Sequence, residues 1–112
     1  MEKTLAAKLG QMGFTSFQIK VLEETSKIPK GQVRTYKDIA KAAGSPKAYR
    51  AVGTVLKNNP FPITIPCHRV IKSSGELGMY SGKSGKRKEE LLNKEGVRTQ
   101  KGKIAAKSIM HK

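Results

Sequence analysis

Residues 35–58 read TYKDIAKAAGSPKAYRAVGTVLKN and predict two short helices joined by a tight turn. Thr35 and Asp38 form a capping-box pattern, which marks the start of the first helix. Gly44 suits the position just after a helix end, where a left-handed residue is common. Ser45-Pro46 then predicts a second helix, with serine as the N-cap and proline at the first helical position. We expect this second helix to fill the rest of the segment.

The second predicted helix has two different faces. Its apolar residues follow the spacing of a buried helical stripe and are Ala48, Ala51, Val52, Val55 and Leu56. Its opposite face carries Lys47, Tyr49, Arg50, Gly53, Thr54 and Lys57. Two helices of this kind are typical of a helix-turn-helix, whose second helix enters a DNA groove. An ordinary helical corner uses the same caps and spacing, so the pattern alone leaves both interpretations open.

The charge of the chain favours DNA binding. The 112 residues include 23 lysines and arginines against 8 acidic residues, which gives a formal net charge of +15. Such an excess attracts polyanions, so nucleic acid is the first expected partner and an anionic membrane the second. A solubilising surface, or the lysine enrichment of heat-loving organisms, would produce the same charge.

The sequence shows no membrane or export signal. No apolar run is long enough to span a bilayer, and the N-terminus lacks the apolar core of a signal peptide. We therefore expect no membrane association and a cytoplasmic protein of prokaryotic type, held near the nucleoid by DNA binding.

The segment before the helix pair predicts a further helix. Thr15 and Gln18 form a capping box, and the helix should end before Pro29, because a residue preceding proline avoids the helical region. Residues 33–35 predict a short extended piece.

The segment after the helix pair predicts a small β-hairpin and a closing helix. Residues 70–71 and 77–80 would pair across a turn as an antiparallel wing. A helix from about Lys86 should close at Gly96.

The predicted fold is a single, mainly α-helical domain with a small β-hairpin, of the winged helix-turn-helix type. We expect it to span residues 14–97, at the usual size of a single domain. Residues 1–13 would form an N-terminal extension, and residues 98–112 a basic and mobile tail.

The chain approaches its only cysteine along a stiff path. Prolines at positions 60, 62 and 66 forbid a helix. The β-branched residues 63–65 predict a short buried strand between these prolines. Such stiffness would fix the direction in which Cys67 points.

Cys67 and His68 are candidates for nucleophilic chemistry. A thiol attacks only as a thiolate, so it needs a base or a positive field. Neighbouring side chains on an extended chain point to opposite faces, so His68 requires a turn or a relaying water to reach Cys67. A carboxylate must then orient the imidazole. A lone cysteine is otherwise more often a small buried apolar residue.

One cysteine and two histidines are too few for a zinc site, so no metal or cofactor is expected.

A series of short motifs extends these observations along the chain. In order, they are Gly31-x-Val33-x-Thr35-Tyr36, Arg50-Ala51-Val52-Gly53, Asn59-Pro60-x-Pro62-Ile63, Pro66-Cys67-His68-Arg69-Val70, Gly78-x-Tyr80-Ser81-Gly82 and Leu91-Leu92-x-x-Glu95-Gly96. Together they resemble the signature of the O6-alkylguanine-DNA alkyltransferases. The resemblance covers roughly residues 14–97.

The resemblance implies a winged-helix domain that binds the DNA minor groove and flips a damaged guanine out of the base stack. Cys67 would be the alkyl acceptor, His68 would take its proton through a water, and Glu95 would orient His68. The transfer would be a displacement that leaves a thioether, so each molecule would act once.

Further roles follow from the same resemblance. Arg50 would fill the gap left by the flipped base. Tyr36 would help rotate the nucleotide and donate to the departing base, and Asn59 would couple the recognition helix to the Cys67 turn. Arg69 would be structural and pair with a carboxylate. DNA contacts would come from Ser45, Lys47, Tyr49, Arg50, Ala51, Gly53, Thr54 and Lys57, and the base pocket from Pro62, Met79, Tyr80 and Ser81.

Simpler roles exist for several of these residues. Tyr36 and Tyr80 would also fit as packed aromatics, and Arg50 as a phosphate contact. Glu95 would also fit as a surface acid, although an acid near a helix C-terminus is electrostatically unfavourable.

The chain departs from the family pattern in three ways. Most members carry an additional N-terminal domain, and the short alkyltransferase-like proteins that lack it replace the acceptor cysteine, whereas Cys67 is present here. Tyr49 stands where the recognition helix usually has a small residue. Met79 replaces a more usual polar residue.

Three functions remain open at this point. The first is stoichiometric alkyl transfer from O6-alkylguanine in double-stranded DNA to Cys67 by a monomeric protein. The second is a damage sensor that flips the lesion and recruits other DNA-repair proteins without transfer. The third is a winged-helix regulator with an inert cysteine.

Overall fold

The computed structural model describes residues 4–61, 64–77, 86–100 and 103–104. In chain order the elements are α1 (Leu5–Gln11), α2 (Ser16–Ser26), β1 (Arg34–Thr35), α3 (Tyr36–Ala42), α4 (Tyr49–Lys57), the short 3-10 helix η1 (Cys67–Arg69), β2 (Val70–Ile71), α5 (Lys86–Lys94), β3 (Thr99–Gln100) and β4 (Lys103–Ile104). This mainly helical content, with a few short strands, confirms the predicted fold class. No helix of the described residues is long and apolar enough to cross a membrane.

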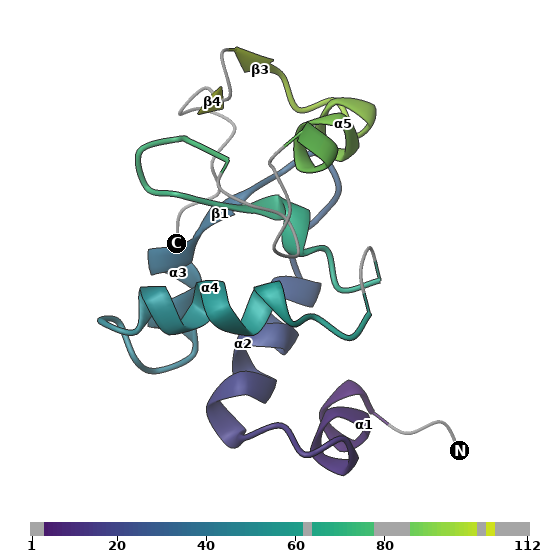
Figure 1. Ribbon diagram of the computed structural model, residues 1–112, viewed down its shortest axis with the longest axis vertical. Coiled ribbons are helices and arrows are strands. Elements are labelled where there is room, and N and C mark those ends of the chain that lie inside the picture. The colour runs from purple at the N-terminus through teal and green to yellow at the C-terminus, as the bar shows by residue number, and fades with distance from the viewer. Residues whose placement is uncertain (1–3, 62–63, 78–85, 101–102, 105–112) are drawn as a thin grey trace.

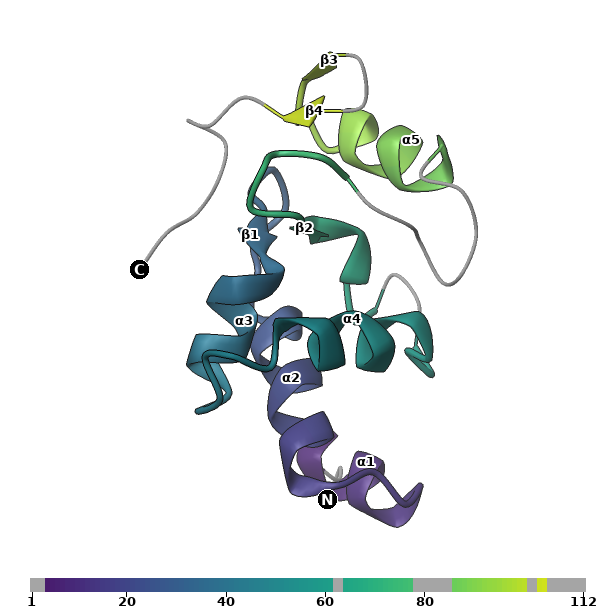
Figure 2. The ribbon, with the colours of Figure 1, turned by 60° about the vertical axis from the view of Figure 1, so that its left-hand side comes forward.

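The helices before the cysteine form one layer of the molecule. Helices α2, α3 and α4 pack against one another, and α1 packs on α2 (Figure 1). Helix α5 and the β3–β4 strands lie at the opposite end. Figure 2 shows β1 and β2 between these two parts. The catalytic candidates on η1 therefore lie at the junction of the two parts.

Each part has its own apolar cluster. The larger cluster joins α1–α4 to the cysteine turn and includes Leu9, Val21, Leu22, Ile28, Ile39, Val52, Val55, Leu56, Ile65, Cys67 and Val70. The smaller cluster supports α5 and the strands and consists of Val33, Ile71, Leu77, Leu92, Val97 and Ile104.

Two capping boxes start α2 and α3, as predicted. The Gln18 backbone N–H donates to Thr15 Oγ1 (3.2 Å), and the Thr15 N–H donates to Gln18 Oε1 (2.8 Å). At α3 the Asp38 N–H donates to Thr35 Oγ1 (3.0 Å), and the Thr35 N–H donates to Asp38 Oδ2 (3.4 Å). Thr35 also ends β1, so one residue joins strand to helix.

The turn between α3 and α4 differs from the prediction. Gly44 adopts a φ of +85°, as expected after a helix end. The predicted helix start at Ser45-Pro46 is wrong, because α4 begins at Tyr49 and Ala48 caps it without a side-chain bond. The Ala48 N–H donates to the Ser45 carbonyl (2.8 Å), which closes a four-residue turn. Proline suits the second position of such a turn as well as a helix start.

Helix α4 buries a narrower stripe than predicted. Val52, Val55 and Leu56 face the core, whereas Ala51 is exposed. The assignment of Ala51 to the apolar face is therefore wrong. Its side chain lies on the outer surface with the basic residues of the helix.

The approach to Cys67 is a turn where a strand was predicted. The Ile65 N–H donates to the Phe61 carbonyl (2.8 Å), so Thr64 and Ile65 do not extend into a strand. The Asn59 side chain supports the turn, because its Nδ2 donates to the Ile65 carbonyl (2.8 Å) and its Oδ1 accepts from the Phe61 N–H (2.9 Å). A side-chain amide thus overrides the β preference of the branched residues.

Strand β2 has a partner that the sequence did not predict. It pairs in parallel with β1, with Arg34 opposite Val70 and Thr35 opposite Ile71. The predicted antiparallel partner lies outside the described residues beyond Leu77. Val70 and Ile71 are both fully buried. A strand covered on both faces is typical of parallel pairing, and the predicted antiparallel pairing of β2 stays a prediction.

Strands β3 and β4 form a hairpin that the sequence did not predict. Strands β3 and β4 pair antiparallel, with Thr99 opposite Ile104. The Ile104 N–H donates to the Gly75 carbonyl (2.9 Å), which fixes the hairpin to the turn after β2. The hairpin lies within residues 98–112, which the sequence predicted to be a mobile tail, and Ile104 is buried in β4.

Replacing Thr35 by alanine should destabilise the protein more than replacing Thr15. Both changes remove an N-cap, but Thr35 is 3% exposed and links β1 to α3. We expect Thr35→Ala to cost about 1–2 kcal/mol of unfolding free energy and Thr15→Ala about 0.5–1 kcal/mol. Urea unfolding at neutral pH measures both values. A loss at Thr15 that equals or exceeds the loss at Thr35 would contradict this prediction.

Candidate active site

Cys67 opens a tight turn in the protein interior. Its side chain belongs to the larger apolar cluster and is 4% exposed. The Cys67 N–H donates to the Ile65 carbonyl (2.8 Å), and the Arg69 N–H donates to the Pro66 carbonyl (2.8 Å). The sequence predicted that His68 needs a turn or a relaying water to reach Cys67, and η1 is such a turn.

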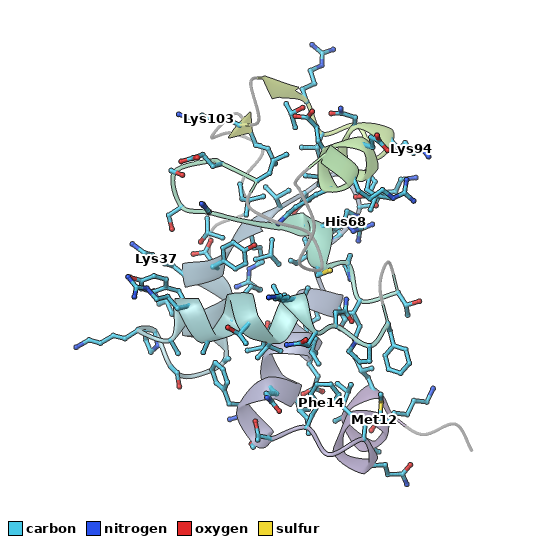
Figure 3. The ribbon with its side chains drawn as sticks, viewed as in Figure 1. Met12, Phe14, Lys37, His68, Lys94 and Lys103 are labelled. Carbon is cyan, nitrogen blue, oxygen red and sulfur yellow. The ribbon has the colours of Figure 1, made fainter. Side chains whose placement is uncertain are left out.

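His68 lies directly behind this turn and faces Glu95. The imidazole is fully buried in the middle of the molecule, below α5 (Figure 3). Its Nε2 is 3.1 Å from Glu95 Oε1. Glu95 follows the last residue of α5, so the packing of α5 on η1 brings the two side chains together. The structure thus selects Glu95 from the eight acidic residues of the chain.

Arg69 fixes the other side of the Glu95 carboxylate. Its Nε donates to Glu95 Oε1 (2.9 Å) and its Nη2 to Oε2 (2.5 Å). Its Nη1 donates to the carbonyl of Ile28, just beyond α2 (2.8 Å). The predicted pairing of Arg69 with a carboxylate is confirmed, and this bidentate contact fixes the orientation of the oxygen that faces His68.

The protonation states of Glu95 and His68 suit His68 to act as a general base. The Arg69 hydrogen bonds hold the pKa of Glu95 below its usual value, so the carboxylate is ionised at neutral pH. Burial lowers the pKa of His68, although Glu95 opposes that effect. A neutral imidazole beside a fixed carboxylate can accept a proton and be stabilised once it is charged.

Tyr36 and Lys88 form a second polar group near the thiol. Tyr36, at the start of α3, packs against the cluster that contains Cys67. Lys88 Nζ donates to Tyr36 Oη (3.3 Å). Burial raises the pKa of Tyr36 to about 12, with a further contribution from Cys67. The phenol therefore keeps its proton and can donate it in a hydrogen bond.

Lys88, which is 1% exposed, was not predicted from the sequence as a site residue. Because it stands in the basic run of residues 86–88, its sequence context is that of a surface lysine. The available signal was its spacing, because Lys88 precedes Leu91 by three residues and Leu92 by four, and so shares their helix face.

Asn59 and the outer face of α4 lie where the sequence predicted them. Asn59 is 8% exposed and connects the end of α4 to the turn before Cys67 through the bonds described above. The side chains expected to contact DNA are exposed or half-buried, and they are Ser45, Lys47, Tyr49, Arg50, Ala51, Gly53, Thr54 and Lys57. Lys37 Nζ lies 5.4 Å from the centre of the Tyr49 ring and joins α3 to this face.

The predicted base pocket lies outside the described residues. This applies to Pro62, Met79, Tyr80 and Ser81. The roles of these residues stay predictions.

Comparison with known proteins adds independent information. Residues 16–97 match the family model described as 6-O-methylguanine DNA methyltransferase, DNA binding domain. The constitutive methylated-DNA–protein-cysteine methyltransferase of Bacillus subtilis is 48% identical over 95 residues, which cover 85% of this chain and 57% of the relative. The human methylated-DNA–protein-cysteine methyltransferase is 48% identical over 94 residues, covering 83% of this chain and 45% of the relative. The chain thus spans about half the length of the curated relatives it matches.

Solved structures show the same fold. Mycobacterium tuberculosis OGT in complex with DNA has a TM-score of 0.70 and 44% identity, covering 74% of this chain and 50% of that chain. S. pombe Atl1, in complex with damaged DNA containing O6-carboxymethylguanine, has a TM-score of 0.76 and 30% identity, covering 86% of this chain and 95% of that chain.

Replacing Glu95 by glutamine should destabilise the protein in a pH-dependent way. The change weakens the contacts to Arg69 and His68, and we expect a loss of about 2 kcal/mol at pH 7. The folded pKa of Glu95 is lowered from 4.5, so its stabilising contribution is complete above about pH 4.5 and declines as pH falls through the lower folded value. Unfolding free energies measured from pH 7 to pH 2 should show the gap between the two proteins narrowing only below pH 4.5.

Glu90→Gln is the matched control. Glu90 lies on the same helix in an exposed pair with Arg87 (3.6 Å), so its replacement should change stability by less than about 0.5 kcal/mol. A gap for Glu95→Gln that is absent at pH 7, or that persists to pH 2, would contradict the assigned role of Glu95.

Proposed function

Because the chain belongs to the 6-O-methylguanine DNA methyltransferase family, by its DNA-binding domain, we propose that it repairs DNA by moving an alkyl group from O6-alkylguanine to Cys67. The observation that carries the proposal is the turn at Cys67, which places His68 against Glu95 while Arg69 holds that carboxylate. The related proteins named above as cysteine methyltransferases support the same chemistry.

The residues around Cys67 suit the activation of a thiol. His68 takes the thiol proton through a water, because a neutral buried imidazole is ready to accept it. Glu95 then faces the imidazolium across 3.1 Å. The negative charge of Glu95 stabilises this cation.

The transfer step is a displacement at the alkyl carbon. The thiolate sulfur of Cys67 forms a bond to that carbon, and the bond between the carbon and guanine O6 breaks. The electron pair of the broken bond stays on the guanine. Tyr36 donates a hydrogen bond to this developing anion, which suits a phenol that keeps its proton. The product thioether is stable, so each molecule acts once.

The outer face of α4 binds the DNA and so brings the damaged guanine to Cys67. A guanine inside the duplex cannot reach a thiol that is 4% exposed, so the nucleotide has to rotate out of the stack. Arg50, exposed in the first turn of α4, takes the vacated place. Asn59 connects the end of α4 to the Cys67 turn through its hydrogen bond to the Ile65 carbonyl. Pro62, Met79, Tyr80 and Ser81 would line the pocket that receives the base.

A second candidate function is damage sensing without transfer. The chain covers 95% of S. pombe Atl1, whose structure contains DNA with O6-carboxymethylguanine. In this alternative the protein flips the lesion and recruits other repair proteins. The presence of Cys67 beside His68 and Glu95 favours transfer, because recognition alone does not require a thiol with a base.

The deciding experiment is to incubate the protein with a duplex that contains O6-methylguanine and then measure the protein mass. We expect the gain of one methyl group on Cys67, and no gain in Cys67→Ala. Tight binding to the lesion without a mass change would reject transfer in favour of sensing. No mass change together with equal affinity for damaged and intact DNA would reject both.

Arg50→Ala should slow transfer more than it weakens binding to intact DNA. Losing the side chain that replaces the flipped base makes the extruded state less stable, and we expect the transfer rate to fall about tenfold or more. Affinity for an intact duplex should fall only about twofold to fivefold, as for a single phosphate contact. Single-turnover kinetics and titration with intact duplex measure the two effects.

Lys57→Ala provides the comparison, because Lys57 is an exposed cation at the other end of α4. It should lower affinity for intact and damaged DNA by the same factor. Equal losses of rate and affinity in Arg50→Ala would reduce Arg50 to a phosphate contact.

A further inference from the structure

The β3–β4 hairpin is a fixed part of the molecule that lies past the end of the family match. The match ends at residue 97, and β3 begins at Thr99. Val97 and Ile104, on either side of the hairpin, are both buried in the smaller apolar cluster. Thr99 Oγ1 donates to Asn93 Oδ1 of α5 (3.3 Å). These contacts hold the hairpin to α5, so its outward side chains have defined positions.

A glycine allows the hairpin to approach the turn after β2. Gly75 has a φ of +92°, and a Cβ atom at this position would lie 3.1 Å from the carbonyl oxygen of Ile104. The Gly75 N–H donates to the Lys72 carbonyl (2.9 Å), and Glu76 pairs with Lys103 in an antiparallel bridge. The turn and the hairpin therefore form one connected unit, with Lys72 and Lys103 on neighbouring segments.

The exposed side chains of this unit and of the adjoining end of α5 include four cations. These four residues, termed the hairpin surface, are Lys72, Lys94, Arg98 and Lys103. Among the described residues, no carboxylate forms an ion pair with any of them. The exposed acid beside them is Glu76, whose Oε1 accepts from Ser74 Oγ (3.1 Å). Like charges gathered in this way repel one another and attract a polyanion.

The hairpin surface and α4 lie on opposite sides of His68. In Figure 3, Lys94 and Lys103 lie above His68 along the long axis of the molecule. Helix α4 lies below it, together with Lys37 of α3. The candidate site is thus between α4, to which the proposed function assigns DNA binding, and a second cationic surface.

Lys72 connects the hairpin surface to the candidate site electrostatically. Burial lowers the pKa of Lys88 to about 8, and the positive charge of Lys72 contributes to this lowering. Lys88 is the residue whose Nζ donates to Tyr36 Oη (3.3 Å). The hairpin surface therefore begins next to the candidate site and not at a remote part of the molecule.

A DNA duplex is long enough to contact both cationic surfaces at once. The long axis of the molecule is 41 Å, which equals about 12 base pairs at a rise of about 3.4 Å. Each strand carries one phosphate at every step. A duplex that presents one nucleotide to Cys67 therefore has phosphates on both sides of that nucleotide.

We propose that the hairpin surface binds the phosphate backbone of the same duplex as α4, on the other side of the flipped nucleotide. The inference rests on the proposed function, because a nucleotide held at Cys67 sets the position of the duplex. Contacts to phosphates carry no base-sequence information, so this surface adds affinity without sequence preference. Each contact also releases counterions from the DNA, which makes the added affinity dependent on salt.

The double variant Arg98→Gln/Lys103→Gln removes two charges from the hairpin surface. Affinity for an intact duplex of about 24 base pairs should fall about tenfold or more, and the slope of log affinity against log salt should decrease in magnitude by about 2. The transfer rate from a saturating O6-methylguanine duplex should stay within about twofold, because the lost contacts act on binding and not on the reacting atoms. Both side chains are exposed, so the melting temperature should stay within about 3 °C.

Two further double variants complete the set. Lys8→Gln/Lys20→Gln is the matched control, because it removes the same charge from exposed positions on α1 and α2. Its affinity should change by less than about twofold, since salt screens distant charges. Lys72→Gln/Lys94→Gln alters the hairpin surface outside the two strands. This variant should reproduce the losses of affinity and slope with the hairpin itself unchanged.

Duplexes shortened on one side of the lesion locate the contact. Removing the arm that the hairpin surface binds, to about four base pairs beyond the lesion, should weaken binding by the wild-type protein as much as Arg98→Gln/Lys103→Gln does. The same shortening should cause no further loss in that variant. Shortening the other arm should weaken binding by both proteins equally.

Several results would overturn this inference. One is a salt slope that is equal in both hairpin-surface variants and in the control. Another is a fall in melting temperature in both hairpin-surface variants that accounts for their loss of affinity. A third is capture of a second labelled duplex by the wild-type protein but not by the variants, with affinity for a single duplex unchanged, because the surface would then bind another DNA molecule.

The binding measurements are independent of methyl transfer, because they use intact DNA. If the hairpin-surface variants lose affinity but wild-type Cys67 accepts no methyl group, the proposed function fails and the phosphate contact stands. If Cys67 is methylated and the variants bind DNA as the control does, the inference about the hairpin surface fails alone.

Discussion

The carboxylate of Glu95 is the contact on which the arrangement of the molecule depends. It accepts hydrogen bonds from Arg69, lies 3.1 Å from His68, and through Arg69 is connected to the carbonyl of Ile28. These contacts join α5, the turn at Cys67 and the end of α2, which belong to two separate apolar clusters. Apolar packing shapes each part, but it is non-directional. The directional bonds to Glu95 fix how the two parts meet, and the thiol lies at that junction.

Local features of the fold could be predicted from the sequence, and long-range features could not. The capping boxes at Thr15 and Thr35 depend on residues three positions apart, and both form as predicted. The pairing of β2 with β1 joins segments about 36 residues apart, and no local pattern encodes it. The Ser45-Pro46 pair fits both a turn and a helix start, so only the packing of α4 decides between them.

In the candidate site, too, local features could be predicted from the sequence and long-range contacts could not. Cys67 and His68 could be identified because their residue types are rare in this chain, and the need for a turn followed from backbone geometry. Composition alone could not select Glu95 from eight acids, because that choice depends on how α5 packs on η1. Lys88 was missed because the sequence around it is basic, and charge normally predicts exposure. Spacing relative to Leu91 and Leu92 carried the only signal of its burial.

The burial of Cys67 has a consequence for the lifetime of the protein before it meets DNA. Under the proposed single-use transfer, Cys67 has to remain unmodified until it meets DNA, and exposed thiolates are the ones that oxidants and small electrophiles attack first. Cys67 as a residue is 4% exposed, so its side chain is shielded from such reagents. Under the proposed function, the same burial that restricts access to this thiol would also preserve it until a duplex presents a single base.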